Sequence, residues 1–227
     1  MGRSRKFTDD QLLDAARDAV VVHGPGATVA QVSAASGAPT GSIYHRFRSR
    51  DELLVRLWLR SIGRLHDRLL QVEHEHDDPD EALVALAVET ARYCRAHPAE
   101  ARAMTLYRHE RLSQTAPEEL REQVVHLNDR AFAMFGRLGA RRFPASADDP
   151  RLVELVFTSV VGLCYGLIRP YIVAGTPIPQ WLDDVIARAC SAALTVADAW
   201  TAPSARDDVP PGPRSRTDRD RAGRLGG

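Results

Sequence analysis

The stretch from Thr28 to Leu54, TVAQVSAASGAPTGSIYHRFRSRDELL, constrains the fold of this chain more than any other. Thr28 and Gln31 have the three-residue spacing of a capping box, which predicts a helix that begins at Thr28. Gly37 suits the left-handed residue that ends such a helix. Pro39, whose ring fixes φ near the helical value, predicts the first turn of a second helix. The stretch therefore predicts two short helices joined by a tight turn.

This arrangement is a helix-turn-helix unit, whose second helix enters the major groove of DNA. Small residues at the start of that helix let the backbone approach base edges, and the donors that follow, including Arg48, suit phosphate groups. The predicted DNA-binding residues are Thr28, Pro39, Thr40, Gly41, Ser42, Tyr44, His45, Arg46 and Arg50. The alternative is that these are simply exposed polar residues of a small helical hairpin, because short patterns of this kind are common.

The same segment resembles the DNA-binding signature of the TetR family of transcriptional regulators. The resemblance rests on GAPTGSIYHRF, residues 37–47, and on RDELL, residues 50–54. It departs from the family at Pro39, where the family has a small hydroxyl residue. It implies an all-α fold in which a helix-turn-helix domain precedes a helical domain for ligand binding and dimerisation.

The charge of the chain is unevenly distributed, although its formal net charge is zero. Residues 1–50 hold 7 basic and 4 acidic side chains, a net charge of +3, whereas residues 51–205 hold 17 basic and 22 acidic ones, a net charge of −5. The positive charge that DNA binding needs thus coincides with the helix-turn-helix segment. Residues 1–7 form a basic arm that either contacts DNA or is an unstructured terminus.

Helical periodicity continues through the rest of the chain, and no segment requires a strand. A long helix from Arg50 to the charged stretch at residues 73–78 would join the DNA-binding unit to everything downstream. Later helices are predicted over residues 78–97, 98–112, 115–138, 149–172 and 180–200. Thr8 with Gln11 has the capping-box spacing and predicts a first helix, and Ser49 with Glu52 repeats it at the start of the long one. With this first helix and the two short ones, the chain has about nine predicted helices.

We expect three parts in the chain. Residues 1–52 form the DNA-binding domain with its basic arm, and residues 53–200 form the ligand-binding and dimerisation domain. Residues 201–227, rich in Pro, Gly, Arg and Asp, are expected to be a disordered tail.

The last two predicted helices are more apolar than the others. Residues 152–172, LVELVFTSVVGLCYGLIRPYI, are apolar on more than one face and must be covered on more than one side. Both helices are either central core helices or part of an interface. The family resemblance implies a four-helix bundle between two subunits, with interface residues Phe157, Val160, Leu167, Ile186, Ala189, Ala193 and Val196. We expect no apolar run near the ~20 residues of a membrane span, and hence a soluble, cytoplasmic protein.

The resemblance also implies a small-molecule pocket between the fourth, seventh and eighth predicted helices. The candidate ligand-binding residues are Trp58, Ile62, His66, Tyr93, Met104, Tyr107, Arg108, Phe132, Phe135, Phe157, Val161, Cys164 and Tyr165. Aromatic and Met residues at helical spacing usually belong to a core, so plain core packing is the alternative for each. A pocket lined by them would be apolar, with Tyr, His or Arg orienting the ligand.

Motifs for chemistry are not found in the sequence. Cys94, Cys164 and Cys190 are widely spaced within apolar patterns, which is typical of buried reduced thiols. No metal-ligand spacing, phosphate loop or nucleophile motif occurs, so we expect no enzyme, no metal and no cofactor.

The family resemblance implies a repressor that binds a pseudo-palindromic operator on double-stranded DNA as a homodimer. A small, largely apolar effector would release it. The alternative is a helix-turn-helix regulator whose helical domain is controlled by a partner protein.

Overall fold

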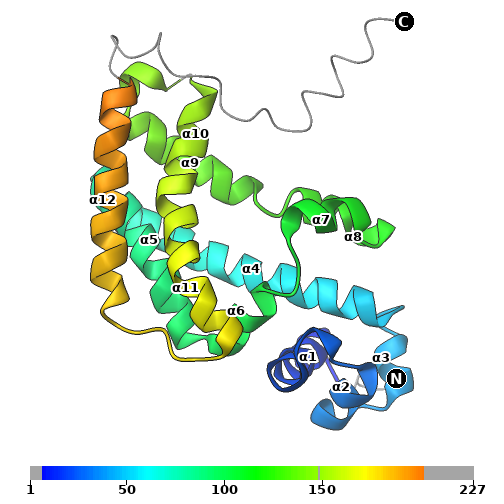
Figure 1. The fold of residues 1–227 in the computed structure, drawn as a ribbon. Helices are drawn as coiled ribbons and strands as arrows, with labels where there is room; N and C mark the ends of the chain where they lie inside the picture. The colour runs from blue at the N-terminus through cyan, green and yellow to red at the C-terminus, as the bar shows by residue number, and fades with distance from the viewer. Residues whose placement is uncertain (1–6, 148, 202–227) are drawn as a thin grey trace, which may run out of the picture.

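The computed structural model describes residues 7–147 and 149–201. These residues form helices and connecting turns, with no strand among them, which confirms the expected all-α fold (Figure 1). The α-helices are α1 (Asp9–His23), α2 (Val29–Ser36), α3 (Thr40–Tyr44), α4 (Arg50–His74), α5 (Pro79–Ala96), α6 (Pro98–Met104), α7 (His109–Thr115), α8 (Glu118–Val125), α9 (Asp129–Arg142), α10 (Pro150–Phe157), α11 (Leu163–Ala174) and α12 (Leu182–Thr201). Short 3-10 turns η1 (Gly24–Gly26) and η2 (Pro144–Ser146) and a π-helical turn η3 (Thr158–Gly162) complete them. The predicted basic arm, apart from Phe7, and the predicted tail, apart from Thr201, lie outside the described residues.

Helices α1 to α3 and the start of α4 form a small unit with its own core at one end of the molecule (Figure 1). Two of the three predicted capping boxes are formed, Thr8 with Gln11 at α1 and Thr28 with Gln31 at α2. At α4 only half of the third is formed, because the Ser49 hydroxyl accepts from the Glu52 N–H (3.0 Å) while the Glu52 carboxylate bonds elsewhere. Gly37, with φ 68°, ends α2 in the left-handed region, where glycine carries no Cβ penalty. The side chains buried in this core include Leu12, Ala16, Ile43, Phe47 and Leu53.

Helix α4 takes part in all three hydrophobic clusters that the described residues form. Leu54 and Leu57 belong to the core of the N-terminal unit, and Val55 and Trp58 pack with α7 and α8. Further along, Leu69 and other α4 side chains enter the main core of the helical domain. At about 1.5 Å per residue, its 25 residues span ~37 Å, so α4 physically connects the two ends of the molecule.

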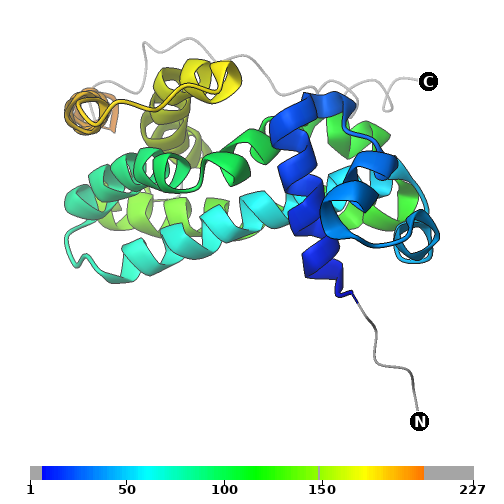
Figure 2. The same ribbon diagram turned by 90° about the horizontal axis from the view of Figure 1, so that it is seen from below.

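The helical domain is built around α5, which contacts α4, α9, α11 and α12. Figure 2 shows α11 and α12 along one edge of the molecule, outside α5. Helix α9 approaches α10 closely at Gly139, where an added Cβ would lie 3.3 Å from Val156 Cγ2. Helix α6 lies against α1, α4 and α11, so it touches both the N-terminal unit and the helical domain.

Two of the predicted helices are divided in the structure. The predicted helix 98–112 becomes α6 and α7, and the predicted helix 115–138 becomes α8 and α9. Thr115 is not a helix cap, because it is the last residue of α7 and its hydroxyl donates to the Arg111 carbonyl (3.0 Å). The breaks let α7 and α8 pack onto α4 through Leu112, Ala116 and Leu120. Helical spacing alone does not reveal such breaks.

The expectation about apolar length was wrong. Arg151–Ala174 is long and apolar enough to cross a membrane by length and composition, although only 33% of its most apolar window is buried inside the chain. Core helices of soluble proteins can have the same length and apolar composition, so these two properties alone are weak support for a membrane span. It does show apolar surface that the chain itself leaves uncovered.

Candidate nucleic-acid interface and effector region

The second helix of the helix-turn-helix unit presents an exposed face. Ile43 and Phe47 point into the core, whereas Tyr44 is 49% exposed. The other exposed predicted residues of this face are Pro39, Thr40, Gly41, Ser42 and His45. Pro39 is the N-cap of α3 rather than its first helical residue, and its carbonyl accepts from the Ser42 N–H (2.8 Å).

Gly41 has no packing reason to be glycine. A Cβ added at this position would meet no atom of the chain within 4 Å, and its φ is not positive. Glycine in a helix costs roughly 0.5–1 kcal/mol relative to alanine. A residue that costs stability without serving the fold fits a surface that a second molecule approaches closely.

The turn between α2 and α3 is held by two serines that the sequence prediction missed. Ser33 Oγ donates to the Ala38 carbonyl (2.6 Å), and Ser36 Oγ accepts from the Ala38 N–H (3.1 Å). Ser36 also donates to the Val32 carbonyl (2.8 Å). A serine in the last turn before a left-handed glycine is the local signal that would have indicated this brace.

Two arginines predicted to contact DNA are used inside the chain. The Arg46 guanidinium donates to the Phe7 carbonyl and to Asp9, at the start of α1. Arg50 Nε donates to the Ala27 carbonyl (2.6 Å), and another nitrogen of Arg50 to the Pro25 carbonyl. Both side chains hold neighbouring segments together, which leaves them less available to phosphate than the sequence suggested.

The remaining predicted contacts differ in availability. The Thr28 hydroxyl accepts from the Gln31 N–H (3.3 Å) as the cap of α2. Arg48 keeps an 81% exposed side chain and reaches Glu119 of α8 only at 3.6 Å. Of the arginines next to α3, Arg48 is therefore the one best placed to meet a phosphate.

A buried carboxylate joins the N-terminal unit to α4 and α6. Glu100 is 5% exposed and accepts from Ser61 Oγ (2.6 Å), Arg17 (3.1 Å) and Arg64 (2.5 Å). Burial raises the pKa of Glu100, but the bonds from Ser61, Arg17 and Arg64 outweigh it and hold the pKa below its usual range. Two residues on, Arg102 of α6 donates to the carbonyls of Ile172 (3.1 Å) and its neighbour at the end of α11.

The predicted ligand-binding residues fall into two groups. Trp58, Tyr93, Met104, Phe135 and Cys164 are buried, and the Trp58 Nε1–H donates to the Met104 carbonyl (3.1 Å). The others are half-buried or exposed: Ile62, His66, Tyr107, Arg108, Phe132, Phe157, Val161 and Tyr165.

Incompletely covered aromatic rings meet between α9 and α10. Phe132 is 40% exposed, and its ring centroid lies 5.1 Å from that of Phe157, which lies 5.8 Å from that of Phe135. Burial lowers the pKa of nearby His66, and Arg130 lowers it further. We use the name effector region for six of the predicted ligand-binding residues, whose role in binding is proposed below: Ile62, His66, Phe132, Phe157, Val161 and Tyr165.

The predicted interface residues also divide by burial. Val160 and Ile186 are each 1% exposed and lie within the chain's own core, so they have no surface to offer a partner. Phe157, Leu167, Ala189 and Ala193 are half-buried, and Val196 is 54% exposed. On α12, the residues at 185, 189, 192 and 196 form an apolar stripe at helical spacing.

The cysteines are buried among α5, α11 and α12, and burial raises the pKa of each thiol to about 12. Within residues 7–147 and 149–201, no cluster of His, Cys, Asp or Glu could hold a metal ion.

An exposed second helix on a helix-turn-helix unit, joined to a helical domain, defines a DNA-binding protein of the helix-turn-helix class. Residues 12–57 match the family model described as bacterial regulatory proteins, tetR family. This match shows a TetR-type DNA-binding domain at the N-terminus, and the chain as a whole shares its fold with solved TetR family regulators. Proteins of this family regulate transcription and are not enzymes.

Solved structures share the fold over most of their length at low sequence identity. FadR from Bacillus subtilis, in complex with stearoyl-CoA, is 13% identical with a TM-score of 0.66, covering 82% of this chain and 99% of that chain. A TetR family regulator from Marinobacter aquaeolei VT8 is 18% identical with a TM-score of 0.62, covering 82% and 94%. The ketosteroid regulator KstR2 of Mycobacterium tuberculosis is 17% identical with a TM-score of 0.59, covering 85% and 96%. No curated protein sequence matches the chain at a significant level.

Proposed function

We propose that the protein is a cytoplasmic repressor that binds a pseudo-palindromic operator as a homodimer and leaves it when a small, largely apolar effector binds. Residues 1–52 would bind DNA and residues 53–200 would bind the effector and dimerise. The observation that carries the proposal is the face of α3, where small and polar side chains and the 49% exposed Tyr44 lie outside the core. Such a face suits base edges in the major groove.

Selection from a pool of random duplexes tests the DNA-binding part. We expect the wild-type protein to recover a two-fold symmetric sequence whose half-sites lie about one helical turn, ~34 Å, apart. Binding should weaken as salt rises from about 50 to about 200 mM, because phosphate contacts release counterions. The Tyr44→Ala variant should recover the site poorly. A folded protein that enriches no sequence would contradict the proposal.

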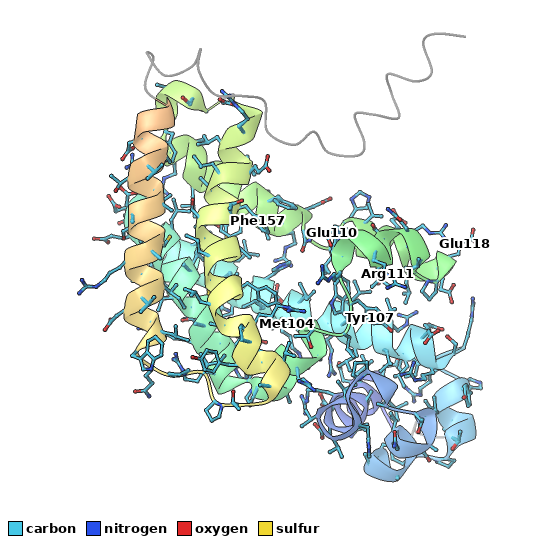
Figure 3. All side chains as sticks on the ribbon, viewed as in Figure 1. Met104, Tyr107, Glu110, Arg111, Glu118 and Phe157 are labelled. Carbon is cyan, nitrogen blue, oxygen red and sulfur yellow. The ribbon has the colours of Figure 1, made fainter. Side chains whose placement is uncertain are left out.

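The effector region supports an apolar ligand. Phe132, Phe157 and Ile62 come from three different helices and are only partly covered by the chain. In Figure 3, Phe157 of α10 and Met104 of α6 lie on the side of the helical domain that faces α7. Two similar structures are regulators named with molecules that have a large apolar part, the acyl chain of stearoyl-CoA for FadR and the ring system of a ketosteroid for KstR2. A ligand there releases DNA only if it binds the DNA-free arrangement of the two subunits more tightly.

Thermal-shift measurements with stearoyl-CoA and with a steroid test the effector part. A bound ligand should raise the melting temperature of the wild-type protein. Phe132→Ala should reduce the shift, whereas Val125→Ala, which trims another exposed apolar residue on α8, should not. Trp58→Ala is a poor test because emptying a buried tryptophan site costs about 3–5 kcal/mol. If neither compound class shifts the melting temperature, control by a partner protein becomes the better account.

A further inference from the structure

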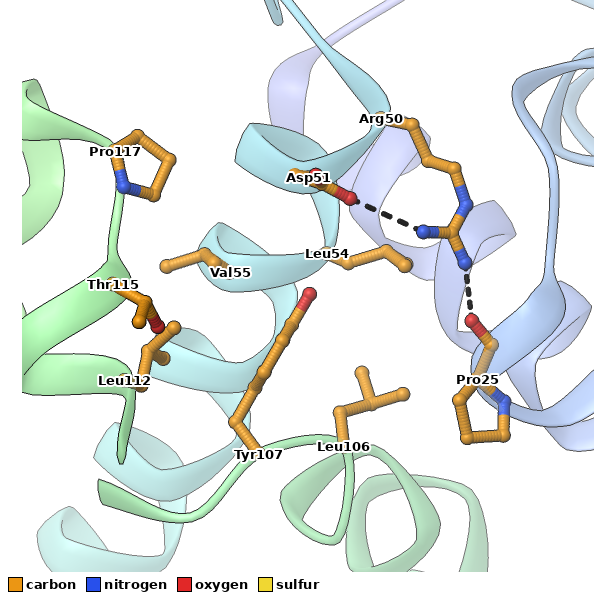
Figure 4. Close-up of a pocket in the computed structure, with 10 residues that line it drawn as sticks. All are labelled: Pro25, Arg50, Asp51, Leu54, Val55, Leu106, Tyr107, Leu112, Thr115 and Pro117. Carbon is orange, nitrogen blue, oxygen red and sulfur yellow. Dashed lines mark hydrogen bonds and ion pairs between the residues drawn. The ribbon is translucent and has the colours of Figure 1, made fainter. Parts of the chain in front are cut away.

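A hollow of about 290 Å³ lies where the helix-turn-helix unit meets α7 and α8 (Figure 4). Pro25, Arg50 and Leu54 line it on the side of the DNA-binding unit. Leu112 and Thr115 of α7, with Pro117, line it on the other side. Among the effector-region residues defined above, none lines this hollow, so the two places are separate.

Rigid apolar side chains form much of the wall. Leu54 is 2% exposed and belongs to the core of the N-terminal unit. Val55 and Leu112, 1% and 4% exposed, belong to the cluster that packs α7 and α8 onto α4. The hollow thus lies at the seam between two packed cores, where its walls are fixed from behind.

The charged groups at the rim already satisfy one another. Arg50 Nε and a second nitrogen donate to backbone carbonyls, and its third nitrogen pairs with Asp51 at 3.2 Å. Figure 4 shows the Arg50 bonds to Asp51 and Pro25. Among these lining residues, Arg50 and Asp51 are already paired with each other, so neither is free to balance the charge of an ion. The hollow therefore favours an uncharged molecule.

Tyr107 supplies the polar group that the fold does not use. Its ring packs edge-on against Trp58, with centroids 6.2 Å apart, and its hydroxyl makes no hydrogen bond to any residue that the structure describes. In Figure 4 the Tyr107 hydroxyl points into the space beside Leu54 and Asp51. Burial raises the pKa of Tyr107, as does Asp51, so the phenol stays protonated and able to donate at neutral pH.

We propose that this junction hollow is a second ligand site, which takes a small uncharged molecule with one apolar ring and a hydroxyl group. The ring packs against Leu54, Val55 and Leu112. The ligand hydroxyl accepts from Tyr107 and donates to the Asp51 carboxylate, a pairing that neither a hydrocarbon nor an anion can make. The proposal needs neither DNA binding nor the effector region to be correct.

Titration of the full chain with phenol and with toluene tests this site. Methyl resonances of Leu54, Val55 and Leu112 should shift saturably with phenol, and toluene should bind roughly tenfold more weakly because it lacks the hydroxyl. Tyr107→Phe should lower the affinity for phenol to about that for toluene. Tyr93→Phe, which removes the phenolic hydroxyl of a buried tyrosine of α5 outside the lining of the hollow, is the control and should change neither affinity.

A filling variant separates this hollow from any other phenol site. Thr115→Phe places a ring into the hollow from its exposed rim and should abolish the methyl shifts, whereas Gln114→Phe, one residue away and outside the lining, should leave them. Shifts that do not saturate, or that persist in Thr115→Phe, would overturn the site. Unchanged phenol binding in Tyr107→Phe would overturn the class of ligand.

Discussion

Gly41 is the residue at which an effect on stability and an effect on DNA binding should be easiest to distinguish. It lies on the exposed face of α3 with open space around it, so an added methyl group meets nothing in the protein. In a DNA complex the same methyl group would stand between the helix backbone and base edges. Gly41→Ala should therefore keep or raise stability, by up to about 1 kcal/mol, and weaken operator binding by about tenfold or more.

Gly63 of α4 is the matched control. A Cβ added there would also meet no atom within 4 Å, yet Gly63 lies in the middle of the connecting helix, away from α3. Gly63→Ala should give the same gain in stability with no loss of DNA affinity. The two quantities are measured by urea unfolding and by titration of a labelled operator. Equal DNA binding by the two variants would remove Gly41 from the interface.

Glu100 carries a pH dependence whose sign is fixed by its partners. Its pKa in the folded protein is lower than its ordinary value of 4.5, so its stabilising effect is complete above that value and is lost as pH falls through the folded pKa. Glu100→Gln should cost about 1–3 kcal/mol near neutral pH. The difference in the free energy of unfolding between Glu100→Gln and wild type, measured with urea, should become smaller below pH 4.5.

Glu122→Gln is the control, because Glu122 lies exposed on the surface of α8. Its free energy of unfolding should equal that of wild type at neutral and at acidic pH. A gap for Glu100→Gln that stays constant from neutral to acidic pH would mean that the carboxylate charge is not what stabilises this junction.

Sequence predicted some of these residue roles and not others. The exposed small residues of α3 followed from local spacing. The roles of Arg46, Arg50 and Glu100 did not, because each depends on a partner brought close by the fold, such as Asp9, Ala27 or Arg17. A long arginine side chain near a DNA-binding helix looks the same in sequence whether it meets phosphate or a carbonyl.

At the scale of elements, α9 faces α10 with two glycines, of which only Gly139 lies in close contact. A Cβ at Gly139 would lie 3.3 Å from Val156 Cγ2, and Val156 is completely buried. At Gly136 the nearest atom, Val153 Cγ2, is 3.8 Å away, an ordinary contact. Gly139→Ala should destabilise the protein by about 1 kcal/mol or more, because the buried neighbour has little room to move.

Gly136→Ala, one turn earlier on the same helix, should instead gain roughly 0.5–1 kcal/mol from better helix propensity. Chemical denaturation of the two variants beside wild type measures both signs. Stabilisation by both substitutions would show that α9 and α10 are not held at the close distance described here.

Helix starts were predictable where a local cap marks them, as at Thr8, Thr28 and Ser49. Glu52 departs from the expected capping box in one respect, because its carboxylate accepts from the Arg48 N–H (2.8 Å) one residue upstream of the cap. The break before α7 was not predictable from the sequence, because it depends on tertiary packing, in which Leu112 joins the same cluster as Trp58. Packing decides such breaks, and helical spacing on either side stays in phase.

At the scale of the whole molecule, α6 connects the DNA-binding unit to the helical domain through side-chain hydrogen bonds. Glu100 connects it to α1 and α4, and Arg102 connects it to the end of α11. The sequence predicted one longer helix in this region and gave no sign of these bonds. The junction hollow was equally hidden, because its walls come from Pro25, from residues 50–55 and from residues 106–117, which meet only in the fold.

The uncovered apolar faces of α11 and α12 lead to a prediction about assembly. Leu163 is 38% and Val196 is 54% exposed, and neither is needed to fill the chain's own core. The full chain should sediment as a dimer, and the double variant Leu163→Asp, Val196→Arg should sediment as a folded monomer, because buried unpaired charges at an interface are costly. Val22→Arg, at a 73% exposed position on α1, should remain dimeric. A monomeric wild-type protein would contradict the proposed assembly.

The measurement that tests the account most directly compares a full operator with a half-site. Once a symmetric sequence is selected, wild-type protein and the Leu163→Asp, Val196→Arg variant are titrated onto both duplexes at the same salt concentration. Wild type should bind the full site at least about a hundredfold more tightly than the half-site, while the variant should bind both weakly and equally. Equal affinity of wild type for the two duplexes would contradict a dimer that reads DNA with two copies of α3.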